Sequence, residues 1–143
     1  MDIEQFITDR VDDQIKWHDK KSQIAQKYYK AYQVIEITLA AIIPLLSFFA
    51  DKFIIQFTIA VIGSSIAIIE AITKLYKFHE NWISYRCTCE ALKTQKYLYV
   101  TKSAPYNVTQ ETVDTLFVKN IEMILSSQNN QWSNLHNQQQ INI

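Results

Sequence analysis

Two apolar runs lie almost end to end in the chain, Val34 to Ala50 and Phe53 to Ile69, with only Asp51 and Lys52 between them. As a helix, the 17 residues of the second run span roughly 26 Å, close to the ~30 Å hydrocarbon thickness of a bilayer. The first run is uncharged only over its last 14 residues, a length that also fits a buried helix of a soluble protein. The pattern therefore predicts a helical hairpin that either crosses a membrane twice, at 34–50 and 53–69, or lies buried inside a soluble bundle.

The residues that flank the two runs favour the membrane alternative. The turn between the runs holds one basic residue. Eight lie beyond the two ends of the hairpin that are away from the turn: Lys16, Lys20, Lys21, Lys27, Lys30, Lys74, Lys77 and Arg86. By the positive-inside rule, both termini are then cytoplasmic and the turn faces outward. Side chains suited to an interfacial belt lie near the same ends: Tyr28, Tyr29, Tyr32, Tyr76 and Trp82.

The segments on either side of the hairpin have helical patterns of their own. Residues 1–33 carry apolar positions at helical intervals and predict a cytosolic amphipathic helix that runs into the first span. After the second run, apolar residues follow the 3,4 spacing of a coiled coil: Leu75, Phe78, Trp82, Tyr85, Cys89 and Leu92. The same register extends back into the run, so we expect one continuous helix from about Phe53 to Tyr99, with a cytosolic stalk at 70–100. Its seam needs a partner, either residues 1–33 or another protomer.

The C-terminal third predicts a loop, a helix and a tail. Pro105 marks a loop at 102–107, and Thr109 is suited to cap a helix over 109–127. The apolar face of that helix consists of Val113, Leu116, Phe117, Ile121, Ile124 and Leu125. We expect this face to pack along the stalk and residues 133–143, rich in Asn and Gln, to form a disordered tail. The whole is an all-α protein with a single domain over 1–132.

Composition excludes several kinds of chemistry. The formal net charge is zero, which gives no reason to expect nucleic-acid binding, and a single glycine cannot build a Gly-rich phosphate loop. Cys87 and Cys89 fall on different helix faces, so we expect neither a disulfide nor a metal pair. No histidine stands at ligand spacing, and we expect exposed or interfacial side chains for His18, His79 and His136. The sequence therefore predicts no metal site, no cofactor and no enzyme activity.

Small and polar residues form a stripe along the hairpin. They recur on one face of the second run at Gln56, Ala60, Gly63, Ala67 and Glu70, and on the first run at Glu36, Ala40 and Ser47. Two alternatives follow. Small residues can allow close packing within the hairpin, while the glutamates pair with nearby lysines. Alternatively, several hairpins surround a water-filled path whose inner mouth carries rings of Glu36 or Glu70 and favours cations.

Four stretches resemble a known family. They are DDQIKWHDKKS at 12–22, IIPLL at 42–46, KFHENWISYRCTCEALKTQKYLY at 77–99 and FVKNIEMILSSQNNQW at 117–132. Together they resemble the bacterial membrane family catalogued as domain of unknown function 4231, over about Asp9 to Trp132. That family is similar to the SLATT group of two-span domains of bacterial conflict systems. The resemblance implies a cytosol-facing helical module with a membrane hairpin, which forms pores when a partner sensor signals an invader.

These observations lead to one prediction of function and two alternatives. We expect an oligomeric channel or pore-forming effector in a bacterial inner membrane, with both termini cytoplasmic and gating through the cytosolic helices. Its partners are the lipid bilayer, further copies of itself, and a separate sensor protein or a signalling nucleotide. The first alternative is a membrane-anchored helical scaffold or interaction module without a pore, and the second is the soluble bundle.

Overall fold

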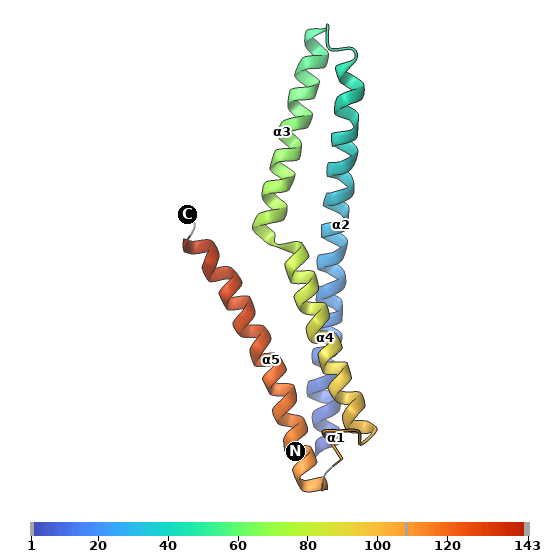
Figure 1. Ribbon diagram of the computed structural model, residues 1–143, viewed down its shortest axis with the longest axis vertical. Coiled ribbons are helices and arrows are strands. Elements are labelled where there is room, and N and C mark those ends of the chain that lie inside the picture. The colour runs from blue at the N-terminus through green and yellow to red at the C-terminus, as the bar shows by residue number, and fades with distance from the viewer. Residues whose placement is uncertain (1, 108, 142–143) are drawn as a thin grey trace. The chain divides into compact units, whose positions relative to one another are not determined.

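The computed structural model describes residues 2–107 and 109–141, and the regular structure of these residues is entirely helical. The elements in chain order are α1 Ile3–Phe6, the π-helical η1 Ile7–Asp12, α2 Asp13–Ser47, α3 Phe53–Tyr76, α4 Phe78–Val100 and α5 Gln110–Ile141 (Figure 1). The predicted all-α class, with two long apolar helices and a C-terminal helix, is confirmed. Where the sequence predicts one domain, the chain divides into two compact units, residues 1–22 with 83–143 and residues 23–82.

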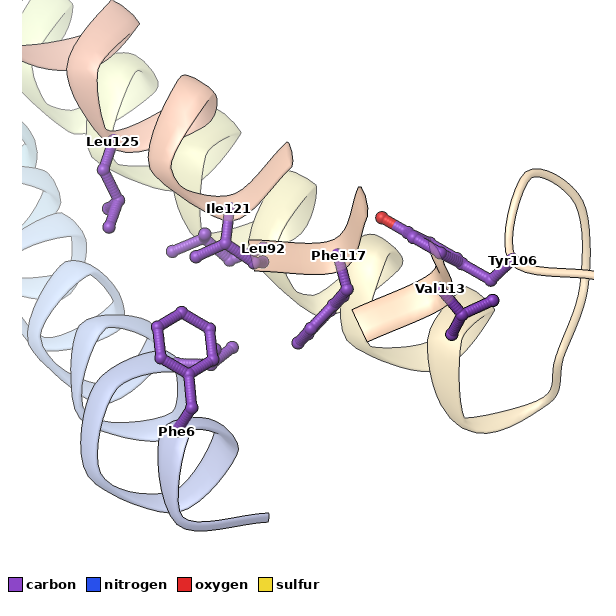
Figure 2. Close-up of a cluster of buried hydrophobic side chains, with 8 residues drawn as sticks. Phe6, Leu92, Tyr106, Val113, Phe117, Ile121 and Leu125 are labelled. Atoms are coloured by element: carbon purple, nitrogen blue, oxygen red, sulfur yellow. The ribbon is translucent and has the colours of Figure 1, made fainter. Parts of the chain in front are cut away.

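The first unit has a buried apolar core. Its buried side chains come from five segments of the chain and pack in one cluster: Phe6, Val11, Leu92, Tyr106, Val113, Phe117, Ile121 and Leu125 (Figure 2). Four of these lie on α5 at helical spacing, on the apolar face predicted for that helix. Phe117 and Ile121 are 0% exposed, because α5 packs against both the N-terminal helices and α4.

The loop between α4 and α5 is held by Tyr106, which is 1% exposed. The Tyr106 hydroxyl donates a hydrogen bond to the side-chain oxygen of Gln95 in α4 and accepts one, at 2.9 Å, from Nδ2 of Asn120 in α5. The peptide bond between Ala104 and Pro105 is cis. The loop predicted at 102–107 is confirmed, and α5 begins directly after Thr109, the residue predicted to cap it.

Helix α5 is longer than the sequence pattern predicts. It continues to Ile141, whereas we expected the helix to end at 127 and a disordered tail to begin at 133. The segment from 110 to 141 contains neither Gly nor Pro, and glutamine is nearly as good a helix former as lysine or glutamate. The polar C-terminal part of this segment therefore lacks an apolar face but still forms a helix. The last two residues of the expected tail lie outside the described part of the chain.

The second unit is an antiparallel hairpin of α2 and α3, which lie side by side and are joined by a short turn (Figure 1). In α2, half-buried residues keep a 3,4 spacing through Tyr29, Tyr32, Glu36, Leu39, Ile43 and Leu46. In α3, the half-buried residues Ile55, Ile59, Ile62, Ile66 and Ile69 follow the same spacing. These are the faces that the two helices turn toward each other, and each covers only one side of its neighbour. Over all its residues, which the structure describes completely, α3 contains none that is fully buried.

The predicted continuous helix from Phe53 to Tyr99 is wrong. α3 ends at Tyr76, and Lys77 takes the left-handed conformation, with φ 48°, before α4 begins at Phe78. The Tyr76 carbonyl accepts a hydrogen bond from Nδ2 of Asn81 at 3.0 Å, so a side chain replaces a helical backbone partner at the break. Spacing alone does not reveal this break, because the apolar positions keep their register on both sides of Lys77.

Candidate functional site: the apolar hairpin and its polar residues

The hairpin exposes large apolar side chains along both helices. Phe48 and Phe53, next to the turn, are 82% and 81% exposed. Other large apolar residues of the hairpin are between 47% and 71% exposed: Val34, Ile35, Ile37, Leu45, Phe49, Ile54, Phe57, Val61, Ile68 and Leu75. Two helical stretches, one ending at Ser47 and one beginning at Phe53, are long and apolar enough to cross a membrane, and their apolar windows are 0% buried. Such a surface has a large unfavourable free energy of hydration in water.

The predicted stripe on α3 lies beside the face that α2 covers, about 100° around the helix from the half-buried isoleucines, and only its last residue, Glu70, is itself half-buried. Gln56, Ala60, Gly63 and Ala67 are all exposed, and a Cβ added to Gly63 would meet no atom within 4 Å. The small residues therefore do not bring α2 and α3 together, since isoleucines occupy the face between them. On α2, Ala40 and Ser47 are likewise exposed, whereas Glu36 is half-buried.

Hydroxyl groups on the hairpin are bonded within their own helices. Thr58, Ser64 and Ser65 each donate to the carbonyl four residues earlier, at 2.8 to 2.9 Å. Thr38 does the same at 2.7 Å, and Nε2 of Gln56 donates to the Ala50 carbonyl at 2.8 Å. These hydroxyl donors therefore need no water, which suits side chains in hydrocarbon.

The two glutamates of the stripe meet at the end of the hairpin away from the turn. The side chain of Glu70 interacts with that of Glu36 on α2, as the antiparallel arrangement predicts. Nζ of Lys74 forms an ion pair with Oε1 of Glu70 at 2.9 Å. The structure thus brings two carboxylates and an ammonium group together at one position along the hairpin.

An aromatic cluster follows directly beyond these charges, within residues 23–82. The ring of Phe78 stacks with Tyr28 and Tyr32, with centroids 5.7 Å apart in both cases. Trp82 stacks with Tyr29 at 6.2 Å, and Nζ of Lys30 lies 6.0 Å from the centre of the Trp82 ring. Aromatic rings and lysines at the end of an apolar hairpin are typical of a membrane interface.

The other seam residues of α4 pack inside the first unit. Tyr85 contacts Trp17, with ring centroids 5.6 Å apart, and Sγ of Cys89 lies 3.6 Å from the Ile15 carbonyl oxygen. Leu92 belongs to the core. Burial raises the pKa of the Cys89 thiol and of the Tyr85 phenol. The chain thus packs five of the six predicted seam residues against its own helices, and the sixth, Leu75, is 64% exposed but also has an interaction within the chain.

The sequence pattern does not reveal the role of His18. We expected an exposed or interfacial side chain, whereas His18 is 1% exposed, and its Nδ1 donates to the Gln14 carbonyl at 2.7 Å. Its Nε2 lies 2.9 Å from the side-chain amide oxygen of Gln128, so the ring joins α2 to α5. His79 is exposed, as expected, and the side chain of His136 lies outside the described part of the chain. The free Cys87 is exposed and Cys89 is buried, so the two thiols do face different sides of α4.

Comparisons with known proteins identify a family and nothing more specific. A family model described as "Protein of unknown function (DUF4231)" matches residues 13–114, which cover α2, α3, α4 and the start of α5. The resemblance stated from the sequence is confirmed for this family. A search of curated proteins and a search of solved structures found no match.

Proposed function

The chain belongs to the DUF4231 family, and we propose from its own residues that it is an oligomeric channel or pore-forming effector of a bacterial inner membrane. In this proposal, residues 34–50 and 53–69 cross the bilayer twice. Several copies then surround a path for ions. The observation that carries the proposal is the apolar surface of the hairpin, which no other part of its compact unit covers.

Lipid is the solvent that fits this surface. At roughly 25 cal/mol per Å² of apolar area, side chains such as Phe57 and Ile68 stabilise a hairpin in hydrocarbon and destabilise it in water. Helical hydrogen bonds satisfy the backbone of both helices, as hydrocarbon requires, except at Pro44, which supplies no N–H donor. The excess of lysines at the ends of the hairpin away from the turn supports an orientation with both termini in the cytoplasm.

The polar stripe supports assembly of several copies. Gln56 and the small residues of α3 are exposed beside the face that packs on α2, where a single hairpin would leave them in contact with lipid. Polar side chains within a membrane tend to face protein or water, and small residues allow helices to approach closely. Neighbouring hairpins therefore provide the most favourable surroundings for this side of α3. Glu36 and Glu70 would then lie at the inner mouth of the path and favour cations.

A flux experiment tests the proposal. The protein is reconstituted into liposomes, and the permeability ratio of K⁺ to Cl⁻ is measured for the unaltered chain, Glu70→Gln, and the control Glu4→Gln, which removes an exposed carboxylate far from the hairpin in sequence. We expect cation-selective flux, a lower K⁺ preference in Glu70→Gln and no change in Glu4→Gln. Absence of flux from oligomeric, bilayer-inserted protein would argue against a channel. The trigger remains a prediction, either a separate sensor protein or a signalling nucleotide, as the similarity to the SLATT group implies.

A second candidate function is a membrane-anchored interaction module without a pore. It is favoured by an open groove of about 350 Å³ on the first unit, which is lined by Cys87, Ala91, Met123 and Ile124 among others. An apolar groove of this kind is suited to hold a segment of another protein. Replacing residues 34–69 with an unrelated two-span anchor distinguishes the two functions. The module keeps its cellular activity after the replacement, whereas the channel loses it.

A further inference from the structure

Helix α3 carries two separate seams with 3,4 spacing. The covered seam, which faces α2, consists of Ile55, Ile59, Ile62, Ile66 and Ile69, and all five are half-buried. The uncovered seam consists of Phe57, Val61, Ser64, Ile68, Ala71 and Leu75, and all six are exposed. Because the seams are offset by two residues, they lie on nearly opposite faces of the helix, about 200° apart.

The uncovered seam is the one in register with α4. From Leu75, the same spacing continues through Phe78 and Trp82, whose rings stack on tyrosines of α2. The covered seam is out of register with these two residues. The break at Lys77 therefore lets α3 turn a different face toward α2 than a continuous helix would present.

The break has a strained residue and a side-chain hydrogen bond that compensates for it in part. Lys77 has φ 48°, in the region that residues with a Cβ disfavour. Asn81 donates through its backbone N–H to the Lys77 carbonyl at 2.9 Å and through Nδ2 to the Tyr76 carbonyl at 3.0 Å. A continuous helix would instead pair the amides after Lys77 with the carbonyls four positions earlier. Straightening thus relieves the strain and restores backbone hydrogen bonds, but it breaks the Asn81 contact with Tyr76.

We propose that residues 73–81 form a hinge with two states. In the bent state Lys77 is left-handed, Asn81 holds the Tyr76 carbonyl, and the covered seam faces α2. In the straight state Lys77 is right-handed, α3 and α4 form one helix, and α3 is rotated so that the uncovered seam faces α2. This rotation changes the side chains that α3 presents to its surroundings. As a gate, the hinge rests on the proposed channel, but the exchange itself is measured without any ion flux.

Two variants shift the proposed equilibrium in opposite directions. Lys77→Gly removes the steric penalty of the left-handed residue, so it favours the bent state by about fivefold to thirtyfold. Asn81→Ala removes the side-chain bond to Tyr76, so it favours the straight state. The matched control is Lys102→Gly, because Lys102 has φ 50° in the loop after α4, outside the hinge.

Disulfide cross-linking reads out the two states. Ile43 of α2 and Ile62 of α3 are half-buried and belong to the faces that the two helices turn toward each other. In a Cys87→Ser background, the pair Ile43→Cys with Ile62→Cys reports the bent state. The pair Ile43→Cys with Ser64→Cys reports the straight state, because Ser64 belongs to the uncovered seam. Only cross-links within a monomer are counted, by the mobility of the oxidised chain on a denaturing gel.

The proposal predicts that both pairs cross-link in the otherwise unaltered chain. Lys77→Gly should slow the Ser64 cross-link by about fivefold to thirtyfold, and Asn81→Ala should accelerate it. Lys102→Gly should change neither rate. A Ser64 cross-link that never forms within a monomer, or that forms at one rate in all three variants, would overturn the hinge. Because no current is measured, this result is independent of whether the protein conducts ions.

Discussion

The two compact units differ in the exposure of their apolar residues, although both are built from helices whose apolar residues have 3,4 spacing. In the first unit, α5 buries Val113, Phe117, Ile121 and Leu125 against segments on two sides. In the hairpin, α3 has more apolar residues and buries none of them fully. The difference arises because each hairpin helix has a single neighbour in its unit, which covers one face and leaves the other apolar.

This comparison shows what spacing can and cannot establish. Apolar residues at every third and fourth position indicate that a helix packs against a partner. The same spacing occurs in helices that lie in water and in helices that lie in lipid. The residues outside the packed seam identify the solvent. On α5 these include polar residues such as Thr115, Lys119 and Glu122, whereas on α3 they include Phe57, Val61 and Ile68. The hairpin is therefore suited to hydrocarbon and the first unit to water.

The largest expected difference between the units concerns a phenylalanine in each. Phe117→Ala should lower the free energy of unfolding by roughly 3–5 kcal/mol, because it leaves a cavity at a residue that is 0% exposed. Phe57→Ala should change it by less than about 0.5 kcal/mol, because Phe57 is 61% exposed and leaves no cavity. Thermal unfolding of the detergent-solubilised protein measures both. Equal losses would mean that Phe57 is packed in a second core.

A lysine on each exposed surface tests the solvent of that surface. Val61→Lys, at the middle of the run 53–69, should make membrane insertion less favourable by roughly 2.5–3.5 kcal/mol. Met123→Lys, at a residue of α5 that is 55% exposed, should change neither insertion nor stability by more than about 0.5 kcal/mol. The fraction of each variant that resists carbonate extraction from membranes gives the measurement. If Val61→Lys and Met123→Lys are extracted alike, the hairpin is not held in lipid.

A smaller difference in stability is expected when the hydroxyl group is removed from a tyrosine in each unit. Tyr106→Phe leaves the side chains of Gln95 and Asn120 without the hydroxyl that joins them, so it should cost roughly 1–3 kcal/mol of stability. Tyr76→Phe removes a hydroxyl from a residue of the hairpin that is 59% exposed, and it should cost less than about 0.5 kcal/mol. Chemical denaturation in detergent, followed by helical circular dichroism, provides the comparison. A loss in Tyr76→Phe that matched the loss in Tyr106→Phe would contradict the account, because it would mean that the exposed Tyr76 hydroxyl contributes as much as the bonded Tyr106 hydroxyl.

Much of the fold follows from periodicity in the sequence. The hairpin turn, the loop at Pro105, the start of α5 after Thr109 and its apolar face were all predicted from short patterns. The burial of His18 was missed, although it follows Val11 and Ile15 at 3,4 spacing and precedes Ser22 and Ala25 in the same register. A polar side chain at a seam position carries no apolar signal. Its burial depends on Gln14 and Gln128, and the latter is remote in sequence.

Two further features could not be predicted from the sequence, for a different reason. They are the break at Lys77 and the location of the polar stripe. Lysine has no preference for the left-handed conformation, and the bond from Asn81 that accompanies it is visible only in three dimensions. The stripe itself was recognised, but periodicity alone does not say which of two apolar faces turns toward α2. That choice depends on the combined packing of Ile55, Ile59, Ile62, Ile66 and Ile69 against the opposite helix.

The most direct test of the membrane hairpin is the solvent around its exposed side chains. Spin labels are attached at Val61→Cys, Ile68→Cys and, as the control in the first unit, Met123→Cys, in a Cys87→Ser background. Collisions with oxygen, which concentrates in hydrocarbon, and with a water-soluble nickel chelate are then measured in liposomes. We expect labels at 61 and 68 to collide more with oxygen and the label at 123 more with nickel. A label at 61 or 68 that collided with nickel as often as the label at 123, in both monomeric and oligomeric protein, would contradict the membrane hairpin.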